Sequence, residues 1–223
     1  MKLARGLAVV VALVSGPVSA RAEPAATDLL FETPYLARVA SGTTLTYRFA
    51  HAVSDEAKLG PSFEDVIDLK LLPGRAQDER TAVVSYFSGE RHRAAGPFPD
   101  MTGNPVVMLF LEQDVLTMSR VLHGNPRYIR NRLRSMLSDG ASVAPARVPL
   151  DGREVEGWRI SLRPFAEDEN RDKFHEFAAK RYEFLVADAV PGGIYEMRTI
   201  TPQADGAAPA LVEERLTFAG AHP

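Results

Sequence analysis

Five histidines are the first candidates for metal binding or acid–base chemistry, and their spacing favours neither. They are His51, His92, His123, His175 and His222. None stands in an H-x-x-x-H or H-x-H pair beside a carboxylate, so the usual zinc signatures are absent from the sequence. His51 continues the apolar face of an expected strand, where a single histidine is more often a hydrogen-bonded core residue than a ligand. We therefore predict no metal site.

The sequence does not indicate a nucleophilic centre either. It has no cysteine and no Gly-x-Ser-x-Gly turn that would display a serine between a strand and a helix. Ser119 and His123 share one helix face at a spacing of four residues, but no third group is evident to orient them. The turn Pro191-Gly192-Gly193 opens no helix, so it lacks the amide cradle of a phosphate loop. The sequence assigns no catalytic residue and no cofactor, and it favours a protein that is not an enzyme.

The densest group of like charges lies in the second of two expected helices. Arg127, Arg130 and Arg134 share one face at positions i, i+3 and i+7. Guanidinium groups in such a row can bind carboxylates or phosphates through paired hydrogen bonds. Two interpretations stay open here. The row is either a docking face for a partner or a solvated face whose arginines pair with acidic neighbours.

The overall charge argues against two classes of partner. The chain has 26 Lys and Arg against 29 Asp and Glu, a formal charge of −3. Residues 1–22 hold three basic and no acidic residues, so the rest has 23 against 29, a charge of −6. Such an acidic chain is not expected to bind nucleic acid or to adhere broadly to an anionic membrane surface. No later segment stays apolar for the roughly twenty residues that a membrane-spanning helix needs, so we expect no integral membrane protein.

The first 22 residues predict export. Lys2 and Arg5 precede the uninterrupted apolar run 7–14, and Ala-Arg-Ala follows at 20–22. This order of basic, apolar and small residues is typical of a cleaved signal peptide. The apolar run is shorter than the roughly twenty residues of a membrane anchor. We expect residues 1–22 to be removed near Ala22 and the mature protein to work in the periplasm, with secretion into the medium as the alternative.

Alternating apolar and polar residues predict β-strands in two groups. The early group is expected at 43–51, 65–72 and 81–87. The late group returns near 148 and is expected at 158–162, 182–186, 194–200 and 211–218. We also expect a loop at 54–63, a short helix at 167–179 and a frayed tail from Ala219.

Between these groups the pattern changes to a helical period. Asn104-Pro105 and Asn125-Pro126 each combine a good N-cap with a proline suited to the first helical turn. Apolar residues follow at helical spacing in both segments. Gly124 is expected to end the first helix, and 139–140 the second. The segment is therefore predicted to be a helical hairpin.

Together these elements predict an α+β fold. We expect 23–223 to form a single domain with a curved, mainly antiparallel, half-barrel-like sheet that helices cover on one face. The helical hairpin is inserted between the early and the late group of strands. Apolar side chains on the concave face are the predicted site for an apolar ligand. They are Leu45, Tyr47, Phe49, Trp158, Tyr182 and Phe184.

The order of elements, with RYEFLVADAVPGGIYEMRTI at 181–200 among the late strands, resembles a group of exported bacterial proteins. These are families of unknown function with a curved antiparallel sheet around a helix, a plan shared by periplasmic lipoprotein carriers. The resemblance covers most of 23–223. It implies the same plan of sheet and helix, and it transfers no functional residue to this chain.

The function favoured by these features is a soluble exported protein that binds or carries an apolar or lipid-like ligand. The alternative is an interaction protein of the cell envelope that docks through the helix bearing Arg127, Arg130 and Arg134 and holds no small ligand.

Overall fold

Within residues 23–204, 206 and 209–223, which the computed structural model describes, nine strands form one sheet. The predicted signal peptide at 1–22 lies outside the described residues. The strands are β1 (Thr44–Val53), β2 (Phe63–Pro73), β3 (Arg80–Tyr86), β4 (Arg93–Met101), β5 (Ser142–Leu150), β6 (Arg153–Leu162), β7 (Arg181–Val186), β8 (Ile194–Thr201) and β9 (Val212–His222). The helices are α1 (Glu56–Leu59), α2 (Pro105–Leu122) and α3 (Pro126–Asp139), and shorter helical segments are η1 (Asp28–Glu32), η2 (Tyr35–Arg38), η3 (Gly89–Arg91) and η4 (Arg171–Ala179).

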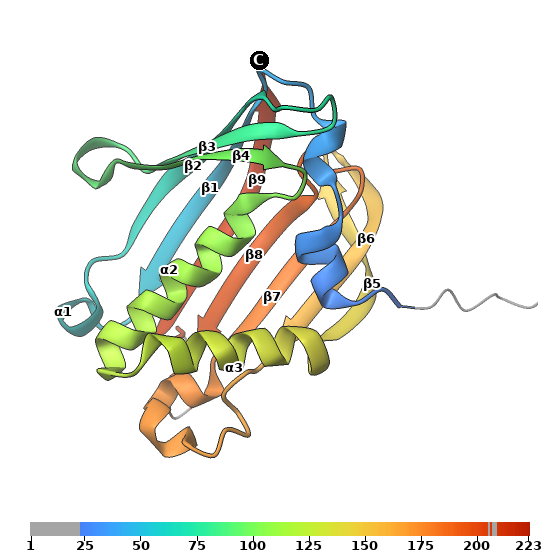
Figure 1. The fold of residues 1–223 in the computed structure, drawn as a ribbon. Helices are drawn as coiled ribbons and strands as arrows, with labels where there is room; N and C mark the ends of the chain where they lie inside the picture. The colour runs from blue at the N-terminus through green and yellow to red at the C-terminus, as the bar shows by residue number, and fades with distance from the viewer. Residues whose placement is uncertain (1–22, 205, 207–208) are drawn as a thin grey trace, which may run out of the picture.

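The sheet is built from two meanders that meet at the first and last strands. Its order is β4-β3-β2-β1-β9-β8-β7-β6-β5, and every neighbouring pair is antiparallel. The β1–β9 pair runs from Thr44 opposite His222 to Val53 opposite Val212, with one irregularity after Thr46. Figure 1 shows the sheet curving around the helices. The predicted α+β fold, with a curved open sheet and an inserted helical hairpin, is confirmed.

The helical hairpin has to cross the sheet because it joins the two edge strands. The chain leaves β4 at one edge and enters β5 at the other, and α2 and α3 form this connection. At a rise of about 1.5 Å per residue the two helices are about 27 Å and 21 Å long, enough to span a curved sheet. In Figure 1, α2 crosses the concave face and α3 runs across the end at which β7 begins and β8 ends, called here the lower end.

Both edge strands carry prolines. Pro97 and Pro99 lie in β4, and Pro145 and Pro149 lie in β5, all four exposed. A proline has no N–H to offer to a further strand, so such residues are tolerated at a sheet edge and discourage pairing with another chain. These prolines and the bulges in the β3–β4 pairing hide the strand alternation, which explains why β4 was not predicted.

Asn104 attaches the first turn of α2 to the sheet. Its side-chain oxygen accepts a hydrogen bond from the Val106 N–H at 3.1 Å, which is the predicted N-cap. Its Nδ2 donates to the Tyr47 hydroxyl and to the Gly192 carbonyl, both at 2.9 Å. One buried amide therefore joins α2, β1 and the β7–β8 loop.

Asp114 attaches the middle of α2 through an ionic contact. It lies on the helix face that packs on the sheet, and its carboxylate is 1 % exposed. The buried Lys180 ammonium pairs with Oδ1, and the Tyr182 hydroxyl donates to Oδ2 at 2.5 Å. Burial raises the pKa of Asp114, and this effect outweighs the opposing influence of the Lys180 charge. α2 is thus held at two points, one neutral and one ionic.

Several local expectations are wrong. The tail from Ala219 is not frayed, because β9 continues to His222 and pairs with β1. The loop at 54–63 contains α1, and the helix at 167–179 is reduced to η4, which is interrupted at His175 with a φ of 49°. α2 ends at Leu122, and His123, not Gly124, takes the left-handed conformation. Ser119 donates to the Gly124 carbonyl at 2.7 Å, so it closes this helix end.

We predict that Asp114→Ala lowers the free energy of unfolding by about 3–5 kcal/mol, because it leaves the Lys180 ammonium buried without a partner. The double variant Asp114→Leu, Lys180→Met should recover much of this loss, since it removes both charges together. Urea unfolding followed by circular dichroism measures both, with exposed Asp139→Ala as the control. A cost below about 1 kcal/mol for Asp114→Ala would show that the pair does not hold α2.

Candidate functional site

An apolar groove opens between α2, α3 and η1. Its volume is about 560 Å³, within the range of roughly 300–1,000 Å³ that is usual for small-ligand sites. Its lining is mostly aliphatic and aromatic, with polar residues at the rim. The lining residues are Thr27, Phe31, Glu32, Met108, Leu109, Leu111, Glu112, Val115, Arg130, Leu133, Arg134 and Leu137.

The groove exists because α2 is apolar on more than one face. Val107 and Met118 are fully buried against the sheet, whereas Met108 lines the groove and is 57 % exposed. From α3, Leu133 and Leu137 point into the same space and are buried. Since α2 and α3 separate along the hairpin, their apolar faces meet only in part. The remaining apolar surface is left accessible at Met108.

α3 contributes two arginines to the groove, and Glu32 and Glu112 contribute two carboxylates. Arg130 forms two hydrogen bonds with the Glu112 carboxylate, at 2.8 and 2.5 Å, and these bonds hold the pKa of Glu112 below its ordinary value. Arg134 is exposed and makes no ion pair with any residue that the structure describes. The groove therefore combines an apolar wall with two charged groups outside any ion pair among the described residues, the Arg134 guanidinium and the Glu32 carboxylate.

The predicted ligand residues lie beneath the helices. Leu45, Tyr47, Phe49, Tyr182 and Phe184 are buried in the main core, and Trp158 is half-buried against it. Tyr182 also borders a hollow of about 580 Å³ beside α3 and β6. None of the six lines the interhelical groove. That they contact a ligand stays a prediction.

The three predicted docking arginines do not act as one row. Arg130 is paired with Glu112, and Arg134 lies at the rim of the groove. Arg127 is exposed in the first turn of α3 and is not part of the groove lining. That they bind a partner stays a prediction.

A polar cluster at the lower end of the sheet was not predicted as a site. The His51 Nδ1 lies 3.0 Å from Glu214 Oε1, close to the Asp114–Lys180 pair. Burial acts to raise the pKa of Glu214, but the His51 hydrogen bond and the nearby Lys180 and His51 charges together hold it below its ordinary value. Among the described residues, no group of three or more His, Cys, Asp or Glu is placed to hold a metal ion.

The period-two alternation of two strands indicates this cluster in the sequence. The inward alternation of Tyr182 and Phe184 continues back to Lys180, and that of Leu216 and Val212 includes Glu214. Extending each strand pattern by one period therefore places polar side chains on the concave face.

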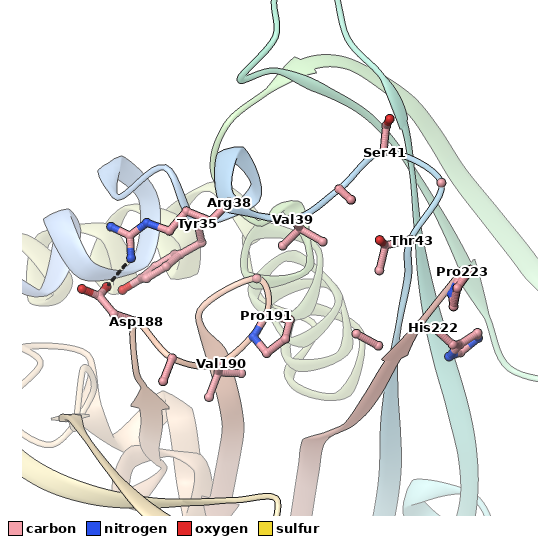
Figure 2. A pocket seen from close by; sticks show the side chains of 15 residues that line it. Tyr35, Arg38, Val39, Ser41, Thr43, Asp188, Val190, Pro191, His222 and Pro223 are labelled. Atoms are coloured by element: carbon pink, nitrogen blue, oxygen red, sulfur yellow. Dashed lines mark ion pairs between the residues drawn. The ribbon is translucent and has the colours of Figure 1, made fainter.

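A third hollow, of about 710 Å³, lies at the other end of the sheet (Figure 2). Loops and strand ends wall it, and Arg38 and Asp188 form an exposed ion pair at 3.4 Å. The β7–β8 loop needs glycine here. Gly192 and Gly193 have φ of 76° and 77°, and a side chain at Gly193 would overlap the Tyr35 ring. Few large apolar side chains line this hollow, so it suits a small ligand less than the groove does.

No protein-family model matches this chain, and no curated protein is significantly similar to it in sequence. Among solved structures, the lipoprotein LppX of Mycobacterium tuberculosis is similar, with a TM-score of 0.31 and 8 % identity over 82 % of this chain and 87 % of that chain. This agrees with the weak resemblance in layout predicted from the sequence, and it carries no information on a ligand. None of the described helices is long and apolar enough to cross a membrane.

We predict that acid destabilises the protein partly through Glu214. Because its folded pKa is lowered, its carboxylate stabilises the fold above the unfolded pKa of about 4.3. That contribution is lost as the pH falls through the folded pKa. The unfolding free energy of the unmodified protein should therefore fall more steeply than that of Glu214→Gln below about pH 5. Urea unfolding at several pH values tests this, with exposed Glu64→Gln as the control. Parallel curves for the protein and Glu214→Gln would contradict it.

Proposed function

We propose that this protein binds and carries an anionic amphiphile, such as a fatty acid, in the groove between α2, α3 and η1. The observation that carries the proposal is an apolar groove of about 560 Å³ with Arg134 in its lining, an arginine without an ionic partner among the described residues. An acyl chain would cover the exposed Met108 side chain and so remove its apolar surface from water, with the already buried Leu133 and Leu137 as further apolar lining. An acidic headgroup would meet the Arg134 guanidinium.

We also propose that the protein functions outside the cytoplasm. Its support is the order of Lys2, Arg5, the apolar run 7–14 and the Ala-Arg-Ala site at 20–22. An aqueous compartment between membranes is where an apolar molecule needs a protein carrier, because its transfer through water is unfavourable. The proposed location and the proposed cargo are therefore consistent with each other.

The cargo is tested with a dansyl-labelled fatty acid, whose fluorescence rises in an apolar site. Met108→Glu should weaken binding at least about tenfold, since an acyl chain would have to bury the new carboxylate. Leu116→Glu is a matched control. Leu116 lies on the same helix and is 49 % exposed, but it does not line the groove. Equal binding by the two variants would place the ligand elsewhere.

The headgroup is tested by a second comparison. Arg134→Gln should weaken binding of the labelled fatty acid severalfold while leaving the affinity for its uncharged alcohol analogue unchanged, because only the acid can pair with the guanidinium. An equal loss for both probes would mean that Arg134 contributes packing and no charge recognition. If neither probe saturates the unmodified protein, the carrier proposal fails. A protein-docking role for Arg127, Arg130 and Arg134 then becomes the explanation to test.

A further inference from the structure

The cavity beside the His51–Glu214 cluster, at the lower end of the sheet, has a different chemical character from the groove. It has a volume of about 320 Å³ and lies between α1, the C-terminal half of α2, and η4. Its lining is rich in titratable side chains, unlike that of the groove. The lining residues are His51, Lys58, Leu59, Gly60, Asp114, Thr117, Arg120, Val121, Phe177, Lys180, Val212 and Glu214.

The two carboxylates of this cavity already have partners. Asp114 is bonded to the Lys180 ammonium and the Tyr182 hydroxyl, and Glu214 lies 3.0 Å from the His51 ring. The Asp114–Lys180 pair is explained by its role in holding α2. Each carboxylate of the cavity therefore already has a hydrogen-bond partner within it.

Two cations at the mouth contribute nothing to that network. Lys58 comes from α1 and Arg120 from the last turn of α2, and both are exposed. Neither forms an ion pair with a residue in the part of the chain that the structure describes. With Lys180 they make three cations against two carboxylates, a local excess of positive charge in an acidic chain. A concave site lined by one excess sign of charge concentrates ions of the other sign.

β8, next to β9 in the sheet, carries a buried hydroxyl that has no hydrogen-bond partner among the described residues. Thr199 on β8 is the cross-strand neighbour of Glu214, so its side chain is on the same face of the sheet. Its hydroxyl is buried and has no hydrogen-bond partner among the described residues. Buried polar atoms are usually hydrogen-bonded, so this unpaired hydroxyl, next to Glu214 although not itself in the lining, is unusual in an ordinary core.

From these observations we infer that the cavity is a binding site for a small anion, one bearing a carboxylate or a phosphate. Its anionic group would lie between Lys58 and Arg120, where the guanidinium can make paired hydrogen bonds. A volume near the lower end of the usual range for ligand sites limits the ligand to a small molecule. The site is separate from the interhelical groove, with which it shares none of its lining residues.

Isothermal titration calorimetry of the purified protein at low salt, with inorganic phosphate and with succinate, tests this inference. Saturable binding of phosphate alone identifies a phosphate site, and saturable binding of succinate alone a carboxylate site. Arg120→Gln and Lys58→Gln should each weaken that binding by about tenfold, the expected loss of one charge-assisted hydrogen bond. Lys70→Gln, an exposed lysine on β2, is the control and should bind as the unmodified protein does.

The location is tested by nuclear magnetic resonance of the histidine rings. The His51 signals, assigned by their loss in His51→Gln, should shift as the anion saturates the protein, because this ring lines the cavity. The signals of the exposed His92 ring should stay in place. The inference is overturned if neither probe gives saturable binding. It is also overturned if Lys70→Gln weakens binding as much as Arg120→Gln, or if binding leaves the His51 signals unmoved.

Discussion

The pairing of the first strand with the last is the interaction on which the rest of this structure depends. β1 and β9 lie in the middle of the sheet, so each of the two meanders extends outward from them. This leaves β4 and β5 as opposite edges, so the segment between them has to pass from one edge of the sheet to the other. The helices lie on the concave face for this reason, and a curved sheet gives their apolar faces the surface that they need.

The same crossing explains why cavities form on both sides of α2. The helix is held at Asn104 and at Asp114, and its face with Val107 and Met118 is buried against the sheet. On its outer side, the separation from α3 leaves the apolar groove at Met108. At its C-terminal end, the space beside Glu214 is left to charged side chains. One helix therefore separates an apolar compartment from a polar one.

Local patterns in the sequence predict the elements well and their partners poorly. The caps at Asn104 and Asn125 and the period-two stretches are properties of adjacent residues, and they were read correctly. The β1–β9 pairing joins segments more than a hundred residues apart, and no local pattern encodes it. The groove also depends on contacts between segments that are distant in the sequence. Arg134 was expected on one helix face with Arg127 and Arg130, but only the tertiary fold sets it and Leu133 beside Met108. The six concave-face residues were placed on the correct face, and the helices cover that face as predicted, so that all six pack in or against the core.

A crystal structure of the protein with a brominated fatty acid tests the central claim most directly, because anomalous scattering locates the bromine atoms without reference to the protein density. We expect bromine peaks in the groove between Met108 and Leu133, with the carboxylate end of the ligand at Arg134. Bromine peaks beneath the helices, among Tyr47 and Phe184, would contradict the assignment of the groove. The absence of any ordered bromine at saturating ligand would contradict the carrier function itself.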